Sequence, residues 1–207
     1  MISLLIIQIA LAKYAVYIHT TQYTIETKST YTCISKNNIT NIIIAGYEAF
    51  GNQGIVDSAA NRIKLAQEAG IPQIDIFVNA FPNFYPPPAA SQVAQDTFNA
   101  FNGKIKMAWI RAGNLEKDIG TNQDYIKQLV NAFQKLSMAV GIFTDSSDWN
   151  MYYGQYSGVS ALSLLYLGGT QPNFLDFLPF GGWTKPSMKL FNDDTTYCKL
   201  SIGHLYY

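Results

Sequence analysis

The stretch Ile105-Lys106-Met107-Ala108-Trp109-Ile110-Arg111-Ala112-Gly113 decides how the fold of this chain is interpreted. Its apolar residues predict a buried strand over 105–110 that runs into a loop. The chain around it alternates strand-like and helix-like segments, which favours a parallel sheet with helices outside it. In a barrel of this kind the carboxyl-terminal ends of the strands carry the chemistry. This strand end offers a cation, a methyl group and a glycine, where a hydrolase needs carboxylates.

Apolar spacing along the rest of the chain predicts a succession of helices and strands. We expect helices over residues 57–69, 89–101, 121–138 (with Thr121 as the candidate N-cap) and 145–151. We expect strands over residues 42–44, 74–78, 105–110, 139–144, 161–167, 188–191 and 199–206. After Gly168, prolines and glycines break the alternation. Roughly eight strands with an irregular last third favour a TIM-like barrel of the α/β class, and a doubly wound open sheet is the competing layout.

The composition limits the classes of function. The 14 basic and 14 acidic residues give a formal charge of zero, and no cluster of five or more Lys or Arg occurs, so nucleic acid is not an expected partner. Hydrophobic residues make up 48% of the 207 residues, enough for the core of one domain. No nucleotide-binding glycine motif is present, so no cofactor is expected. The cysteines and the histidines His19 and His204 have no metal-site spacing, so no metal is expected.

The start of the chain resembles a secretory signal peptide. Ile2 to Ala12 is an apolar run that ends in small residues. It is too short for a bilayer, which takes about 20 apolar residues, so no membrane span is expected. We therefore assign residues 1–20 to a signal peptide and 23–207 to the folded domain, and place the protein outside the cell or in a vesicle lumen. A buried N-terminal strand or helix is the alternative.

A secreted chain also allows two covalent features. Its two cysteines, Cys33 and Cys198, are an even number, which suggests a disulfide, and two buried thiols are the alternative. Asn38-Ile39-Thr40 is an N-glycosylation sequon, which makes Asn38 the candidate acceptor.

Several short motifs follow one another in an order that resembles a known family. The most specific is Pro179-Phe180-Gly181-Gly182-Trp183-Thr184-Lys185-Pro186, followed by residues 188–191 and 194–198. Val140-Gly141-Ile142-Phe143-Thr144 with Trp149 also matches, as do Tyr31-Thr32-Cys33, residues 42–44, 69–70 and 75–78. Over residues 23–207 the chain is similar to the lysozymes of glycoside hydrolase family 25, especially their secreted nematode and protist branch.

The resemblance implies a barrel of five β/α units followed by extra strands, and cleavage of the muramic acid to glucosamine linkage of peptidoglycan. It implies an Asp after the first strand, an Asp-x-Glu after the fourth and an Asp in the last. In this chain the first position falls near Glu26, the pair falls on Arg111 and Gly113, and the last falls near Gly203, so the catalytic acids are degenerate. The matching cysteine positions also imply a bridge between Cys33 and Cys198.

The chemistry of these replacements predicts an inactive enzyme. Glycoside cleavage needs a proton donor and usually a second carboxylate about 5–9 Å away. Arg111 cannot donate its proton, because the pKa of a guanidinium exceeds about 12. Gly113 has no side chain, and Glu26 alone cannot fill both roles. Glu116 and Asp118 in the following loop are the alternative acids, but a solvated charged loop is the simpler interpretation.

Other residues near strand ends are candidates for binding. A sugar-stacking floor is one interpretation of the aromatic side chains there, and ordinary packing is the favoured one; these side chains are Tyr47, Phe81, Trp109, Trp149, Tyr166 and Trp183. Arg111 can bind an anionic group of a glycan or of a partner protein. It can equally neutralise Glu26 or Glu48 within this protein, and we slightly favour this second interpretation. Asp145 and Asp148 are expected at a helix N-terminus, and His204 in the interior or at the rim.

Three functions therefore compete. The first is a secreted lysozyme-like pseudoenzyme that binds a glycan, a peptidoglycan fragment or a protein partner. The second is an active muramidase with relocated acids. The third is a structural subunit of an extracellular or surface assembly. Binding to peptidoglycan separates the first from the third, and wall lysis identifies the second.

Overall fold

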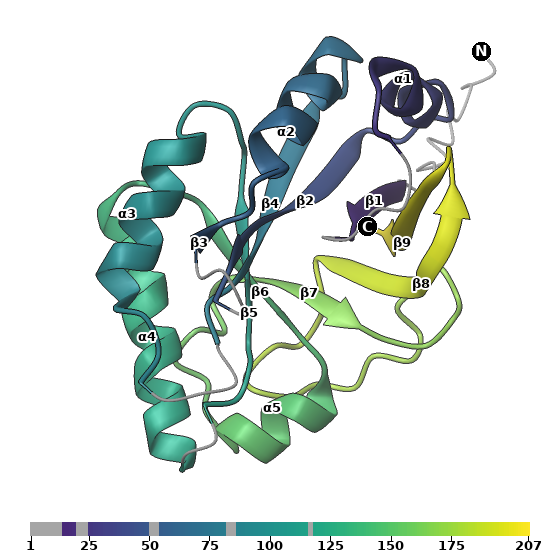
Figure 1. Ribbon diagram of the computed structural model, residues 1–207. Helices are drawn as coiled ribbons and strands as arrows, with labels where there is room; N and C mark the ends of the chain where they lie inside the picture. Colours follow the sequence, from purple (N-terminus) through teal and green to yellow (C-terminus); the bar gives the residue numbers. More distant parts are fainter. Residues whose placement is uncertain (1–13, 20–24, 50–53, 82–85, 116–117) are drawn as a thin grey trace, which may run out of the picture.

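A computed structural model of the protein describes residues 14–19, 25–49, 54–81, 86–115 and 118–207. Figure 1 shows the helices packed around part of a ring of strands. The strands are β1 (Tyr14–Ile18), β2 (Asn41–Glu48), β3 (Gly54–Ile55), β4 (Gln73–Asn79), β5 (Ala108–Arg111), β6 (Val140–Thr144), β7 (Ser163–Leu167), β8 (Met188–Tyr197) and β9 (Leu200–Tyr206). The helices are α1 (Lys28–Lys36), α2 (Ala59–Glu68), α3 (Ala90–Phe101), α4 (Ile119–Lys135) and α5 (Ser146–Tyr153).

The strands close into a mixed barrel. The nine-stranded sheet runs in the order β1-β9-β8-β7-β6-β5-β4-β2-β3, and β1 also pairs with β2. This pairing leaves the short β3 on the edge of β2 and eight strands in the ring. Within the ring, neighbouring strands from β1 through β8 are parallel and β9 is antiparallel to both β8 and β1, whereas β3, outside the ring, is antiparallel to β2. Five β/α units followed by extra strands confirm the predicted barrel and exclude the open sheet.

Alternate residues of the strands fill the barrel interior. The interior cluster consists of Ala15, Ile43, Phe77, Trp109, Leu165, Met188, Leu190 and Leu205. A second, larger cluster lies between the strands and the helices. Trp109 is the largest member of the interior cluster, and a Cβ on Gly141 would lie 2.4 Å from its ring. A glycine in β6 therefore makes room for the indole of β5.

The first strand corrects the predicted domain boundary. Tyr14–Ile18 pairs with β2 and β9, with Val16 opposite both Ile42 and His204. The folded domain therefore begins no later than Tyr14, and not at Tyr23, because removal of residues 1–20 would remove a barrel strand. Because the apolar run Ile2 to Ala12 is separated from this apolar strand only by Lys13, composition gives little sign of the boundary. The run Ile2 to Ala12 itself lies outside the described residues.

Aspartates cap the N-termini of α4 and α5. Helix α4 begins after Asp118, whose Oδ1 accepts a hydrogen bond from the Thr121 backbone N–H at 3.0 Å. Asp118 is thus the N-cap, and the prediction of Thr121 was wrong. Asp145 caps α5 as expected, because its carboxylate accepts from the backbone N–H groups of Ser147 and Asp148. In the described part of the chain, no helix is long and apolar enough to cross a bilayer.

A loop between β7 and β8 replaces a helix on the outer wall of the barrel. The side chain of Lys189 is fully buried beneath it, and its Nζ donates to Asp176 Oδ1 at 2.6 Å and to the Asn173 carbonyl at 3.1 Å. The ring of Phe177 packs edge-on against Tyr166 at 5.2 Å. An ion pair and aromatic contacts hold this irregular segment, where the alternation of the sequence fails.

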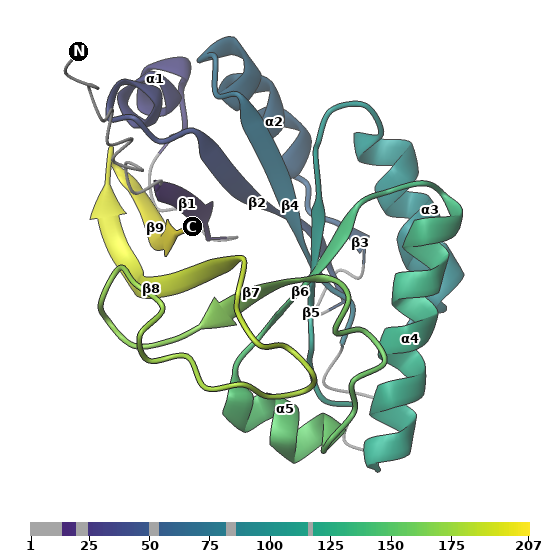
Figure 2. The same cartoon turned by 180° about the vertical axis from the view of Figure 1, so that it is seen from behind.

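The disulfide joins the start and the end of the domain. Cys33 in α1 and Cys198 in the β8–β9 turn are bonded, with their Cα atoms 5.8 Å apart and a sequence separation of 165 residues. Figure 2 shows β1, β8 and β9 side by side near α1. The predicted pairing is confirmed.

Candidate ligand-binding face

The carboxyl-terminal ends of the parallel strands gather polar side chains on one face of the barrel, called here the carboxyl face. Strand β2 ends at Glu48, β4 at Asn79 and β5 at Arg111, and His19 follows β1. Asn79 Nδ2 donates to Glu48 Oε2 at 3.0 Å. In barrels of this type such a face forms the binding site.

Arg111 is exposed at the end of β5, as predicted. Of the carboxylates that the structure describes, none forms an ion pair with it. Its charge acts at longer range on Asp148: burial and the neighbouring Asp145 raise the pKa of the Asp148 carboxyl, and Arg111 opposes this rise. The favoured interpretation, in which Arg111 neutralises Glu26 or Glu48 directly, is therefore corrected.

Gly113 has no room for a carboxylate. A Cβ at this position would lie 2.6 Å from Cβ and 2.8 Å from Cγ of Phe81. Phe81 is buried and packs edge-on against Tyr125, with ring centroids 5.2 Å apart. The space beside this strand end is occupied by an aromatic ring.

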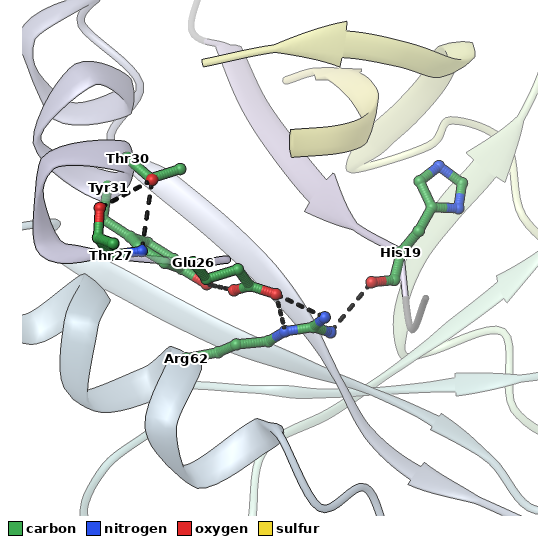
Figure 3. Close-up of polar contacts among 6 residues, drawn as sticks. All are labelled: His19, Glu26, Thr27, Thr30, Tyr31 and Arg62. Atoms are coloured by element: carbon green, nitrogen blue, oxygen red, sulfur yellow. Dashed lines mark hydrogen bonds and ion pairs between the residues drawn. The ribbon is translucent and has the colours of Figure 1, made fainter. Parts of the chain in front are cut away.

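Glu26 belongs to a buried structural pair (Figure 3). Its Oε1 accepts from Arg62 Nε at 2.8 Å and lies 2.7 Å from Arg62 Nη2, and its Oε2 accepts from the Tyr31 hydroxyl at 2.6 Å. Arg62 also donates to the His19 carbonyl at 3.0 Å. Both carboxylate oxygens are engaged, and β1 ends well before Glu26, at Ile18. The assignment of Glu26 to the first acidic position was therefore wrong, and Tyr17 and His19 lie at this strand end.

Tyr17 faces the barrel interior beside other aromatic rings. Its ring centroid lies 5.4 Å from that of Phe77, which in turn lies 5.3 Å from that of Phe143. Burial raises the pKa of the Tyr17 hydroxyl, and the carboxylates Glu48 and Asp193 raise it further. The hydroxyl therefore stays protonated and able to donate. We call Tyr17, Phe77 and Phe143 the aromatic floor.

Asp193 is a functional candidate that sequence reasoning missed. It lies in β8, where the pairing with β9 is irregular between Asn192 and Thr195. Its Oδ1 is 2.9 Å from His19 Nε2 and would be 2.8 Å from a Cβ on Gly203. The family resemblance points to the last strand, whereas this carboxylate comes from the strand before it. The adjacent pair Asp193-Asp194 is the sequence signal that could have pointed to it.

The predicted aromatic candidates do not form an open stacking surface. Each is at most 9% exposed: Tyr47, Phe81, Trp109, Trp149, Tyr166 and Trp183. The three indole N–H groups are already bonded, since Trp149 donates to the Tyr156 carbonyl, Trp183 to the Leu162 carbonyl and Trp109 to Asp75. These rings are buried in packing contacts, and of the aromatic floor only Tyr17 and Phe143, which are partly exposed, leave ring surface near the strand ends.

The remaining candidates lie away from the carboxyl face or outside the described residues. Asn38 is exposed just after α1, with a φ of +61°. His204 contacts the Tyr197 ring at 5.4 Å, and burial lowers the pKa of its imidazole. Glu116 lies outside the described residues. Within the described ranges, no group of three or more His, Cys, Asp or Glu side chains is arranged to hold a metal ion.

Known proteins are similar to this chain in sequence and in fold. Residues 10–191 match the family described as Lysozyme-like protein 1. Lysozyme-like protein 5 of Caenorhabditis elegans is 30% identical over 186 residues, which cover 86% of this chain and 85% of that protein. Probable GH family 25 lysozyme 4 of Dictyostelium discoideum is 27% identical over 179 residues, which cover 84% and 83% of the two chains.

The fold agrees with the sequence matches. The solved structure of a family GH25 lysozyme from Aspergillus fumigatus superposes with a TM-score of 0.76 at 12% identity, covering 95% of this chain and 93% of that chain. The barrel with five β/α units and the sequence match over most of the chain both indicate the same family. The chain belongs to the lysozyme-like proteins of glycoside hydrolase family 25, as its motifs predict.

Proposed function

We propose that this protein is a secreted lysozyme-like pseudoenzyme that binds a cell-wall type glycan at its carboxyl face without cleaving it. The proposal rests on the two residues at the end of β5. Arg111 is exposed there, and Phe81 occupies the space that a side chain at Gly113 would need. Acid catalysis at a glycosidic oxygen needs a protonated carboxyl group at such a position. A guanidinium and a phenyl ring cannot supply one.

Binding is supported by what the face retains. Glu48, Asn79, Asp193 and Arg111 offer acceptors and donors for sugar hydroxyls, and the aromatic floor lies among the strands that carry them. Arg111, which has no described carboxylate partner, suits an anionic group such as the lactyl carboxylate of muramic acid. Secretion is part of the proposal, and a leader that ends by Ala12 would leave β1 whole.

The test combines a lysis assay with a binding assay. We expect the purified, disulfide-intact protein to release no reducing ends from bacterial cell walls, since loss of acid–base catalysis alone costs about 10²–10⁴-fold. We expect it to cosediment with insoluble peptidoglycan, and Arg111→Glu to weaken this binding. Lys64→Glu is the matched control, because Lys64 is an exposed cation on α2.

Two results would contradict the proposal. Robust release of reducing ends that is abolished by Glu48→Gln or Asp193→Asn would identify an active muramidase with relocated acids. Absence of binding to peptidoglycan, with intact folding, would favour a structural subunit of an assembly.

A further inference from the structure

Asp193 lies where the last strand lacks a side chain. In β9, Gly203 is paired with Tyr17 of β1, and both Ala15 and Leu205, two residues away along their strands, belong to the interior cluster. The missing Cβ of Gly203 therefore points inward. Its position is 2.6 Å from Leu190 Cδ1 and 2.8 Å from Asp193 Oδ1. The neighbouring strand thus places a carboxylate in the space that the glycine leaves.

An irregularity in β8 turns Asp193 toward this position. The register of the β8–β9 pair shifts between Asn192 and Thr195, and Asp194 has a left-handed φ of +57°. The backbone N–H of Asp194 donates to Asp193 Oδ1 at 3.0 Å. Bulges of this kind change the direction of a side chain at the rim of a barrel.

The Asp193 carboxylate contacts His19 and is still accessible. His19 Nε2 lies 2.9 Å from Asp193 Oδ1, and half of the Asp193 side-chain surface is exposed. The Tyr17 hydroxyl is close enough for Asp193 to affect its ionisation. An accessible carboxylate beside an aromatic ring and a hydroxyl suits a sugar, whose hydroxyls donate to the carboxylate while its apolar face lies on the ring.

We infer that Asp193, positioned by His19, is the acceptor by which the carboxyl face recognises a saccharide hydroxyl, in place of an acid on the last strand. This inference rests on the proposed glycan binding. It assigns to β8 a specificity-determining role for a polyhydroxylated ligand, and it does not require the ligand to be charged.

The experiment measures binding of two probes to the full protein by calorimetry: the neutral oligosaccharide chitotetraose and soluble, peptide-free peptidoglycan strands. We expect Asp193→Asn to weaken binding of both probes about 10-fold or more, as for loss of a hydrogen bond to a charged group. Asp194→Asn is the matched control, because Asp194 is the exposed neighbour in β8 and accepts a hydrogen bond from Ser201 Oγ at 2.9 Å. We expect this variant to bind within twofold of the wild type.

The outcomes separate the inference from the proposed function. If the wild type binds neither probe, glycan binding itself is overturned. If the wild type binds and both variants bind equally well, only the role of Asp193 is overturned. The thermal midpoints of the unliganded variants are measured as well. Midpoints within about 2 °C of the wild type, together with loss of binding only in Asp193→Asn, support direct contact with the ligand. A purely structural role of Asp193 would lower the midpoint of that variant.

Discussion

The Glu26–Arg62 pair is a polar contact that connects the segment before α1 to α2. Arg62 is 2% exposed, and its guanidinium joins α2 to the segment before α1 and to the backbone carbonyl of His19. The Tyr31 hydroxyl completes the group by donating to the second oxygen of Glu26. Because two charges are buried together and fully bonded, removing one leaves the other uncompensated.

Glu26→Gln is therefore expected to destabilise the protein by about 3–5 kcal/mol, the cost of removing one partner of a buried ion pair. The measurement is the free energy of unfolding from urea denaturation. Glu68→Gln is the matched control, since its pair with Lys64 is exposed and long at 3.9 Å, and it should change stability by about 0.5 kcal/mol or less. Equal effects of the two substitutions would show that the buried pair is not a structural anchor.

Restoring the acids at β5 should not restore catalysis. In Arg111→Asp with Gly113→Glu, the new side chain at 113 meets Phe81 at 2.6 Å, so it is displaced or Phe81 is forced from its site. We expect no release of reducing ends from cell walls, and a loss of about 1–3 kcal/mol from overpacking. Strong hydrolysis by this double variant, with unchanged thermal stability, would contradict the occupancy of this space by Phe81.

At the scale of secondary-structure elements, neighbouring strands supply what a single strand lacks. Gly141 in β6 admits the indole of Trp109 from β5, and Gly203 in β9 admits the carboxylate of Asp193 from β8. Asp75 in β4 is fully buried and accepts from Trp109 Nε1 at 3.1 Å and from Gln73 Nε2 at 3.1 Å. In both places a glycine on one strand leaves room for a side chain of the neighbouring strand, and these contacts position side chains of the core and of the candidate site.

A double-mutant cycle tests whether the Asp193 carboxylate occupies the space beside Gly203. Gly203→Ala alone should destabilise the protein by about 1–3 kcal/mol, because its Cβ overlaps Asp193 and Leu190. With Asp193→Ala in place, the same substitution should cost less, and the difference is the coupling energy from urea denaturation. Strict additivity would mean that the carboxylate does not occupy this space.

Asp75 should make stability depend on pH. Burial raises the pKa of its carboxyl, and the hydrogen bonds from Trp109, Gln73 and Asn41 only partly oppose this. A pKa raised in the folded state stabilises the protein below the unfolded value of about 3.9, and this contribution is lost as pH rises through the folded pKa. The stability of the wild type relative to Asp75→Asn should therefore fall as pH increases above about 4. A constant difference across that range, measured by urea denaturation, would contradict the prediction.

At the scale of the whole molecule, closure depends on contacts between the two ends of the chain. Strand β1 pairs with β9 over Tyr14 to Ile18, and the disulfide links α1 to the β8–β9 turn. The wall formed by β7, β8 and β9 has a loop held by buried Lys189 where the other strands have helices. The disulfide therefore reinforces the part of the barrel that has least helical cover.

Cys33→Ser with Cys198→Ser should lower stability by about 4–5 kcal/mol in the chain-entropy account, because the bond spans 165 residues of sequence. Thermal unfolding with and without reductant measures the effect. The wild type under reducing conditions should match the double variant, which itself should be insensitive to reductant. A reductant effect on the double variant would point to a cause other than this bond.

The sequence by itself determined the order of strands and helices from β2 onward except for the short β3, the barrel class, the bridge between Cys33 and Cys198, and the position of Arg111 at a strand end. These features follow from local apolar spacing, from an even cysteine count and from motifs that lie close together along the chain. The same local reasoning failed at Tyr14–Ile18, a strand that apolar spacing did not distinguish from the apolar run before it in the sequence.

Only the tertiary structure decided the role of Glu26, the nature of the ring surface and the place of Asp193. Arg62 is 36 residues from Glu26, and Asp193 and His19 come from opposite ends of the domain. A carboxylate in a sequence is equally compatible with catalysis, binding or an internal ion pair. Its role depends on which distant groups the barrel closure brings within hydrogen-bond reach, and no local pattern carries that information.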